Sequence, residues 1–254
     1  MYNPDCKSNE TSKIMPNRTV IITGASRGIG FEAAKYFMRL DHFKVIALSR
    51  NKPGLELLAA ECSALNKTSE LIPVVFDFDD FLADPSKRFQ PITKVLSHVD
   101  ILINNAGFLV NKSFDQIGSG EILKMFRVNF MGPSLLIREL LPFMGRAGDT
   151  HIVNIGSMGG FQGSSRFPGL AFYSASKAAL ANLTESLAVE FKDKNIFINC
   201  LALGAVQTEM LAQAFPGYNA PVKPQEIAAF IGDFALHSHK FMNGKIIPLA
   251  LSNP

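Results

Sequence analysis

The segment from Arg18 to Phe37 constrains the fold of this chain more than any other stretch. An apolar, β-branched run from Thr19 to Ile22 is typical of a strand buried on both faces. Three closely spaced glycines follow directly, and residues 31–37 then form a good helix-forming sequence. A strand, a glycine-rich turn and a helix in this order predict the start of a βαβ unit.

The glycines suit a turn that holds a phosphate group. Gly24 and Gly28 allow the backbone to turn tightly and to approach a pyrophosphate at the positive end of the following helix. Gly30 allows the helix and the sheet to pack closely. The alternative is an ordinary glycine-rich turn, but the order of the elements favours nucleotide binding. The predicted cofactor contacts in this turn are Gly24, Ser26, Arg27, Gly28, Ile29 and Gly30.

The end of the second predicted strand bears on which nucleotide binds. Residues 44–48 form an apolar strand that ends at Ser49 and Arg50. A carboxylate at this place accepts hydrogen bonds from the ribose 2′-hydroxyl of NAD, whereas an arginine can meet the 2′-phosphate of NADP. No Asp or Glu occurs at positions 47–51, so Arg50 and Arg27 favour NADP(H) over NAD(H). The alternative is that Arg50 is a solvated loop charge.

Strands and helices alternate along the rest of the chain. Alternation of this kind implies parallel strands joined by right-handed crossovers. We therefore expect an α/β fold, a single-domain doubly wound parallel sheet of the Rossmann type with about seven strands and helices on both faces. The domain is expected to span residues 18–254, after a polar, mobile tail at residues 1–17. Further strands are predicted at 71–76, 99–103, 151–155, 196–201 and 245–249, and helices at 54–65, 86–97, 120–143, 171–192 and 225–236.

Composition supports one large core and argues against several classes of partner. The chain has 254 residues, of which 47% are hydrophobic and 19% charged, enough to bury a sizeable core. A net charge of +3 without a basic stripe argues against a nucleic-acid partner. The sequence has no apolar run of membrane-spanning length and no signal peptide, so we expect a cytoplasmic protein without a membrane partner. The cysteines, Cys6, Cys62 and Cys200, have unrelated spacings that predict no metal site.

A tyrosine and a lysine are candidates for proton-transfer chemistry. Tyr173 and Lys177 are four residues apart in a predicted helix, which places both side chains on one face. A nearby ammonium favours the phenolate and lowers the pKa of a tyrosine. Ser157 follows a predicted buried strand, at the edge where parallel sheets bind their ligands. The alternatives are an ordinary amphipathic helix and a serine in a turn.

Three further segments are candidates for ligand contact. The turn Asn104-Asn105-Ala106-Gly107 follows a strand and suits close backbone approach, although such turns are equally common for structural reasons. Asp77 follows the third strand and could hold the adenine edge or merely cap the next segment. Asn129 lies among apolar residues and must find hydrogen-bond partners if it is buried.

Taken together, these motifs resemble the short-chain dehydrogenase/reductase family from about Arg18 to Pro248. The resemblance implies that Tyr173 is the general acid/base and that Ser157 holds and polarises the substrate carbonyl. It also implies that Lys177 binds the nicotinamide ribose and lowers the Tyr173 pKa, and that Asn129 orders a water in a proton relay. Hydride would pass between a nicotinamide and a carbonyl or secondary-alcohol substrate, without a metal. The matching set is Thr23, Gly24, Gly28, Ile29, Gly30, Asn104, Asn105, Ala106, Gly107, Asn129, Ser157, Tyr173 and Lys177.

The chain departs from the family pattern at several places. Ser157 precedes Tyr173 by sixteen residues, more than is usual, so the intervening loop is expected to bulge beside the substrate. Leu203-Gly204 replaces a Pro-Gly pair, although Thr208 could still bond the nicotinamide carboxamide. The segment from Glu209 to Lys223 is short for a substrate lid, and the C-terminus lacks an Asp-Gly-Gly sequence.

The sequence leaves the substrate and the reaction direction open. Phe161, Phe167, Phe172 and Met210 could line an apolar pocket, but aromatic residues at such spacings are more often core. Two other functions remain as alternatives: a noncatalytic NADP sensor on the same fold, and an isomerase or lyase of the same family. The apolar helices at 120–143 and 171–192 resemble the family's dimer helices, which predicts a homodimer or homotetramer.

Overall fold

The computed structural model describes residues 17–251, so the tail predicted at 1–17 lies almost entirely outside the described residues. Within them, one seven-stranded sheet has the order β3-β2-β1-β4-β5-β6-β7, and every neighbouring pair is parallel. The strand order reverses between β1 and β4, which start the two halves of the sheet. Ligands bind at such a switch point, beyond the carboxyl ends of the strands. The strands are β1 (Arg18–Thr23), β2 (Phe43–Ser49), β3 (Glu70–Val75), β4 (Ile101–Asn104), β5 (Thr150–Ser157), β6 (Ile196–Leu203) and β7 (Ile246–Leu249).

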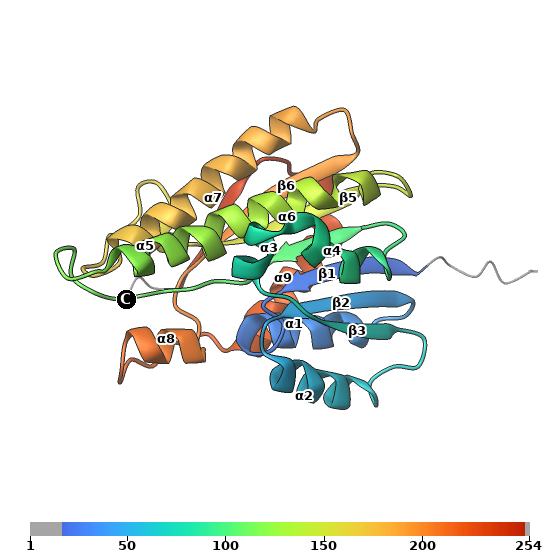
Figure 1. Cartoon of the computed structure of the whole chain (residues 1–254), viewed down its shortest axis with the longest axis horizontal. Helices are drawn as coiled ribbons and strands as arrows, with labels where there is room; N and C mark the ends of the chain where they lie inside the picture. The colour runs from blue at the N-terminus through green and yellow to red at the C-terminus, as the bar shows by residue number, and fades with distance from the viewer. Residues whose placement is uncertain (1–16, 252–254) are drawn as a thin grey trace, which may run out of the picture.

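Helices cover both faces of the sheet, as the alternation predicted (Figure 1). On β1, Val20 and Ile22 face one core together with helices α1, α2 and α9, whereas Ile21 faces a second core with α3, α4, α6 and α7. All three side chains are fully buried, which explains why β1 is continuously apolar instead of alternating. The helices are α1 (Gly28–Met38), α2 (Lys52–Cys62), α3 (Phe78–Ala83), α4 (Pro85–Thr93), α5 (Ser119–Phe126), α6 (Gly132–Leu140), α7 (Ala171–Glu190), α8 (Glu209–Ala214) and α9 (Pro224–His237).

The long helix predicted at 120–143 is interrupted. Helix α5 passes into a π turn, η1 (Arg127–Met131), and then into α6, with a short 3₁₀ turn η2 (Leu141–Phe143) at its end. Pro133 has no N–H, so it cannot donate the α-helical hydrogen bond to the carbonyl of Asn129. The wider π turn accommodates that missing donor, and such turns are frequent at functional sites.

Two short helices were not predicted. Helix α3 begins where the Asp77 side chain accepts a hydrogen bond from the N–H of Asp79 at 2.8 Å. Helix α8 begins in the same way at Thr208, whose hydroxyl accepts from the N–H of Leu211 at 3.2 Å. Both have six residues, too few to show a helical period. Two further 3₁₀ turns, η3 (Met158–Gly160) and η4 (Ser238–Lys240), follow β5 and α9.

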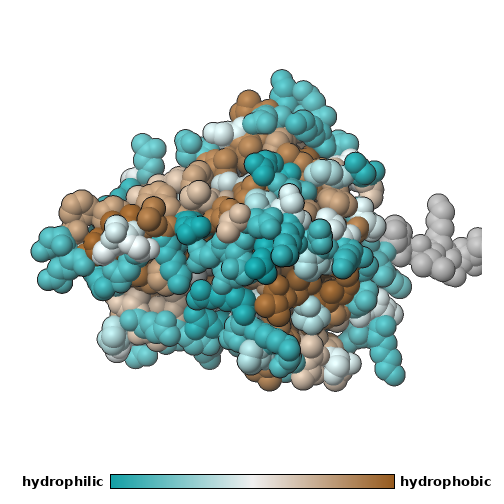
Figure 2. Space-filling model, in the orientation of Figure 1, coloured by the Kyte–Doolittle hydropathy of each residue, from teal (hydrophilic) through white to brown (hydrophobic). Residues whose placement is uncertain are grey.

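The surface in the view of Figure 2 is mostly hydrophilic. Apolar residues gather at its left end near α5 and in front of the β3 edge, where Val75 is exposed. No helix within residues 17–251 has the length and hydropathy needed to cross a membrane.

Candidate functional site

A cavity of about 460 Å³ opens at the carboxyl ends of β1, β2, β4, β5 and β6. It lies at the switch point of the sheet, where the fold places a ligand. Most of the predicted site residues line it: Gly24, Ser26, Arg27, Gly28, Ile29, Arg50, Asp77, Asn105, Ala106, Gly107, Ser157, Tyr173, Lys177 and Thr208. Gly30 and Asn129 are not in the lining but lie behind it.

The glycine loop takes the backbone conformation that the sequence predicted. Gly24 and Gly28 have φ angles of +70° and +56°, a region that other residues rarely adopt. Gly30 lies in the first turn of α1. A side chain there would collide with the carbonyl oxygen of Gly24. The loop and the helix can therefore pack this closely only because position 30 is glycine.

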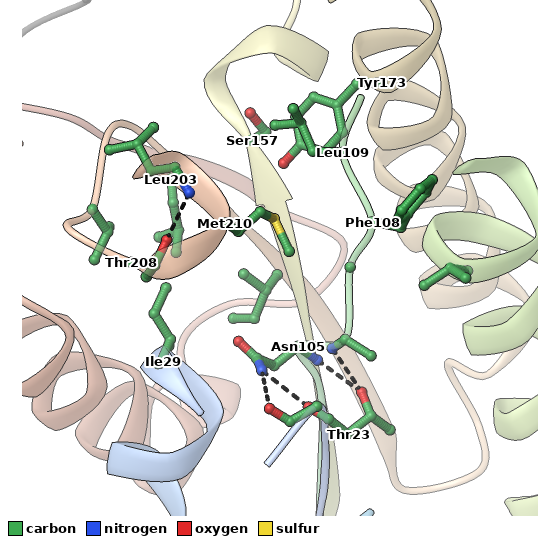
Figure 3. A pocket seen from close by; sticks show the side chains of 18 of the residues that line it. Thr23, Ile29, Asn105, Phe108, Leu109, Ser157, Tyr173, Leu203, Thr208 and Met210 are labelled. Carbon is green, nitrogen blue, oxygen red and sulfur yellow. Dashed lines mark hydrogen bonds between the residues drawn. The ribbon is translucent and has the colours of Figure 1, made fainter. Parts of the chain in front are cut away.

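Thr23 joins the glycine loop to the Asn-Asn-Ala-Gly turn. Its hydroxyl accepts hydrogen bonds from the N–H groups of Asn105 and Ala106, each at 3.0 Å. The Asn105 side chain returns two bonds, to the carbonyls of Thr23 at 3.0 Å and Gly24 at 3.3 Å (Figure 3). Thr23 is a positioning residue that was not among the predicted cofactor contacts. Thr23 did belong to the set of residues by which the sequence resembles the family.

Two arginines stand at the nucleotide end of the cavity. Ser49, at the end of β2, donates to the Ser26 hydroxyl at 2.8 Å and so ties β2 to the glycine loop. Arg27 and Arg50 flank this contact in sequence, are both exposed, and line the cavity. Neither forms an ion pair with another described residue. Both guanidinium groups therefore keep their full set of donors for an anion.

Asp77 has the capping role that was considered for it, and it lies where it could also meet a ligand. Its carboxylate caps α3, as described above, and the residue also lines the cavity beside Phe76 and Phe78. The capping bond uses one carboxylate oxygen, so the second oxygen can accept a hydrogen bond from another group.

The three residues predicted to act on the substrate come together. Ser157 ends β5, while Tyr173 and Lys177 lie one turn apart at the start of α7. Figure 3 shows the side chains of Ser157 and Tyr173 next to each other in the cavity. The ammonium of Lys177 is buried and donates to the carbonyl of Ile155 at 2.7 Å.

Burial dominates the proton affinities of this group. Desolvation raises the pKa of Tyr173, against a lowering by the neighbouring Ser157 hydroxyl. Desolvation also lowers the pKa of Lys177 to about 8, against a small opposing effect of Cys200. The predicted lowering of the Tyr173 pKa by Lys177 is therefore wrong for this structure. The ammonium is held against the Ile155 carbonyl, and loss of hydration outweighs any stabilisation of the phenolate.

Asn129 is fully buried and holds the backbone of the cavity wall. Its side-chain oxygen accepts from the N–H of Phe108 at 2.7 Å, and its amide donates to the carbonyl of Phe108 at 2.8 Å and to the hydroxyl of Ser176 at 2.9 Å. The amide thus finds the partners that its burial required. Both of its donors are occupied, so the side chain fixes Phe108 relative to α7.

The loop between Ser157 and Tyr173 reaches the cavity at one of its aromatic residues. Of the four apolar residues considered for a substrate pocket, Phe167 and Met210 line the cavity, whereas Phe161 and Phe172 do not. Phe172 instead stacks on the exposed Phe114, with ring centroids 5.3 Å apart. Sequence reasoning missed Leu109, Met158, Leu170 and Phe215, which also line the cavity, because only the folded loops bring them there.

Comparison with known proteins now identifies the family. Residues 18–219 match the family model for short chain dehydrogenases, a span that runs from β1 past the end of α8. The chain belongs to the short-chain dehydrogenase/reductase family. This confirms the resemblance drawn from the glycine loop, Asn105 and the Tyr173–Lys177 pair.

Individual members of the family are similar over most of this chain. A dehydrogenase/reductase SDR family protein 7-like of Drosophila melanogaster is 35% identical over 206 residues, which is 80% of this chain and 61% of the relative. The chain thus spans about three-fifths of that relative's length. The 3-ketoacyl-(acyl-carrier-protein) reductase of Brucella melitensis, solved with NADH, aligns with a TM-score of 0.80 and 25% identity, over 92% of this chain and 97% of that one.

A second solved structure carries the other nicotinamide cofactor. The Pseudomonas aeruginosa RhlG/NADP active-site complex aligns with a TM-score of 0.79 and 25% identity, over 93% of this chain and 96% of that one. Short-chain dehydrogenase/reductases similar to this chain therefore bind NAD(H) or NADP(H). Within residues 17–251, no cluster of three or more His, Cys, Asp or Glu side chains could hold a metal ion.

Proposed function

We propose that the protein is an NADP(H)-dependent oxidoreductase that transfers hydride between the nicotinamide and a carbonyl or secondary-alcohol substrate. One observation carries this proposal. The hydroxyls of Ser157 and Tyr173 and the buried ammonium of Lys177 share a cavity with a glycine loop shaped for a pyrophosphate. Family membership supports the same reaction class.

The residues of the cavity divide the work of such a reaction. The nicotinamide, when bound, supplies or accepts the hydride. Ser157 and Tyr173 donate hydrogen bonds to the substrate oxygen, and Tyr173 gives that oxygen its proton as the negative charge develops. Because burial raises the pKa of Tyr173, the phenol is protonated at neutral pH, as a general acid for carbonyl reduction must be.

Lys177 supplies positive charge at the same place. With its pKa at about 8, it is mostly protonated at neutral pH. Its ammonium stabilises a phenolate once Tyr173 has given up its proton. Asn129 acts as a positioning residue, since it fixes Phe108 beside the Asn-Ala-Gly turn.

The test of the chemistry is Tyr173→Phe, which removes one oxygen and keeps the ring. We expect kcat for ketone reduction with NADPH to fall by about a hundredfold or more, since general acid catalysis contributes on that scale. The Kd for NADPH, followed by its fluorescence, should stay within about twofold of wild type. Equal activity of the variant would refute the role of Tyr173. Tight NADPH binding without turnover in wild type would favour the noncatalytic sensor.

The preference for NADP(H) is supported by the guanidinium groups of Arg27 and Arg50, which form no ion pair within residues 17–251. The absence of a carboxylate at positions 47–51 supports it too. A hydrogen bond to a charged group contributes roughly 1.5–3 kcal/mol. Arg50→Ala should therefore weaken NADPH binding by about ten- to hundredfold and leave NADH binding unchanged. Equal loss for both nucleotides would show that Arg50 does not contact the 2′-phosphate.

Assembly and location complete the proposal. Leu123, Met131 and Val189 are exposed apolar residues on α5, η1 and α7, the helices from which a homodimer or homotetramer was predicted. Covering such residues in a subunit interface removes them from water. Light scattering at micromolar concentration should give the mass of two or four chains, and a monomeric mass would refute this.

We also propose that the protein acts in the cytoplasm, which imaging of a tagged full-length chain would test.

A further inference from the structure

The cavity has two chemically different halves. The half next to the glycine loop contains Arg27, Arg50 and Asp77 and suits a charged nucleotide. Glu209 belongs to this half too, because its carboxylate lies 3.7 Å from the place where a Cβ on Gly28 would be. The other half surrounds the hydroxyls of Ser157 and Tyr173.

Apolar side chains from several segments line this second half. They come from separate parts of the chain: the β4–α5 loop, η3, the loop before α7, and α8 with the residue that follows it. In the view of Figure 3, Leu109 is drawn with the Ser157 and Tyr173 hydroxyls, and Met210 lies below them. The apolar lining residues from these segments include Leu109, Met158, Phe167, Leu170, Met210 and Phe215.

Hydrogen bonds between these segments hold the wall together. The N–H of Lys112 donates to the carbonyl of Gly169 at 3.1 Å, which joins the β4–α5 loop to the loop before α7. The side chain of Asn111 donates to the carbonyl of Ala214 at 2.9 Å, which joins the β4–α5 loop to α8. The lid formed by α8, although short, is therefore fastened across the cavity and helps to exclude water from it.

Lys177 and Lys124 are the two lysines among the lining residues of the cavity. Lys177 is held by the carbonyl of Ile155. The ammonium of Lys124 lies over the ring of Phe108, 5.0 Å from its centroid, and forms no ion pair with a described residue. An anionic group on the substrate would lose its water among apolar side chains, and the Lys124 ammonium would have to exchange the ring of Phe108 for that group.

We propose that the substrate is a neutral, largely apolar ketone or secondary alcohol whose carbon skeleton fills this half of the cavity. This inference rests on the proposed function and names the substrate class of the same site. In reduction, the C=O π bond breaks, the carbonyl carbon receives the hydride of the reduced nicotinamide, and the oxygen receives the proton of Tyr173. The products are the secondary alcohol and the oxidised nicotinamide, and oxidation runs the same step in reverse.

The test uses matched ketones with the wild-type protein and NADPH. From 2-butanone to 2-octanone, kcat/KM should rise about three- to fourfold per methylene, as burial of each CH₂ predicts. The carboxylate 7-oxooctanoate, with a methyl ketone on a chain of similar length, should be at least about a hundredfold poorer than 2-octanone. Met210→Ala should reduce the gain per methylene, whereas Leu57→Ala, an exposed site on α2, should not change it.

A binding measurement tests the proposed substrate class without depending on turnover. Calorimetry of the protein with NADP⁺ should show 2-octanone binding and no comparable binding of 7-oxooctanoate. If no ketone is turned over but 2-octanone still binds selectively, the proposed oxidoreductase function fails and the apolar compartment stands. If 7-oxooctanoate binds or reacts as well as 2-octanone, the inference is overturned. Loss of that carboxylate's binding in Lys124→Met would then identify Lys124 as its partner.

Discussion

Replacement of Thr23 by valine should separate the hydroxyl's role from that of the side chain's shape. Valine has nearly the same volume as threonine, so the packing of the buried side chain, 1% exposed, is kept. The hydroxyl that accepts the N–H groups of Asn105 and Ala106 is lost. Each buried donor left without a partner costs roughly 1–3 kcal/mol. With some relaxation of the turn, we expect the free energy of unfolding to fall by about 2–4 kcal/mol.

Thr23→Ser is the matched control, because it keeps the hydroxyl and removes a methyl group. Its cost should be about 1 kcal/mol. Urea unfolding followed by circular dichroism measures both variants, with the slope against urea checked for two-state behaviour. In thermal unfolding, a loss of 3 kcal/mol in a chain of this size lowers Tm by roughly 6–12 °C.

The same substitution should also weaken nucleotide binding, because Thr23 joins the glycine loop to the Asn105-Ala106-Gly107 turn and both segments line the cavity. We expect the Kd for NADPH to rise by about tenfold or more in Thr23→Val and by less in Thr23→Ser. If valine is no more harmful than serine in either measurement, the two hydrogen bonds do not organise the site and the reasoning fails.

Three further predictions concern other parts of the site. Gly30→Ala places a methyl group against the Gly24 carbonyl, so NADPH binding should weaken by at least about a hundredfold. An NADPH titration close to that of the wild type would contradict this. The control is Gly120→Ala, because position 120 has open space around it. Lys177 has its pKa lowered to about 8 by burial, so the unfolded chain binds its proton more tightly. Its ionisation should make wild-type stability rise by about 3 kcal/mol relative to Lys177→Met between pH 8 and pH 10.5, and parallel urea-unfolding profiles would refute this. Asn111→Ala removes the hydrogen bond to the Ala214 carbonyl. KM for 2-octanone should therefore rise about threefold or more, with NADPH affinity unchanged. An unchanged KM would show that this bond does not hold α8 over the substrate.

Local sequence patterns predicted the fold because each needs only near neighbours in the chain. A short segment already has the geometry that these patterns report. Examples are the strand and glycines of residues 19–30, and the four-residue spacing of Tyr173 and Lys177. The continuous apolar character of β1 likewise announced burial on both faces. The short helices α3 and α8 escaped prediction because six residues are too few to show a period.

The sequence by itself determined the doubly wound architecture and the family, and it named the residues that we propose carry the chemistry. Tertiary structure decided their environment. The hydroxyl of Thr23 meets Asn105 across 82 positions of the chain, and Asn111 meets Ala214 across 103. Burial raised the pKa of Tyr173 where the four-residue spacing alone suggested a lower one. Hydration, like contacts between distant segments, depends on what the folded chain places around a group, and no local pattern contains that information.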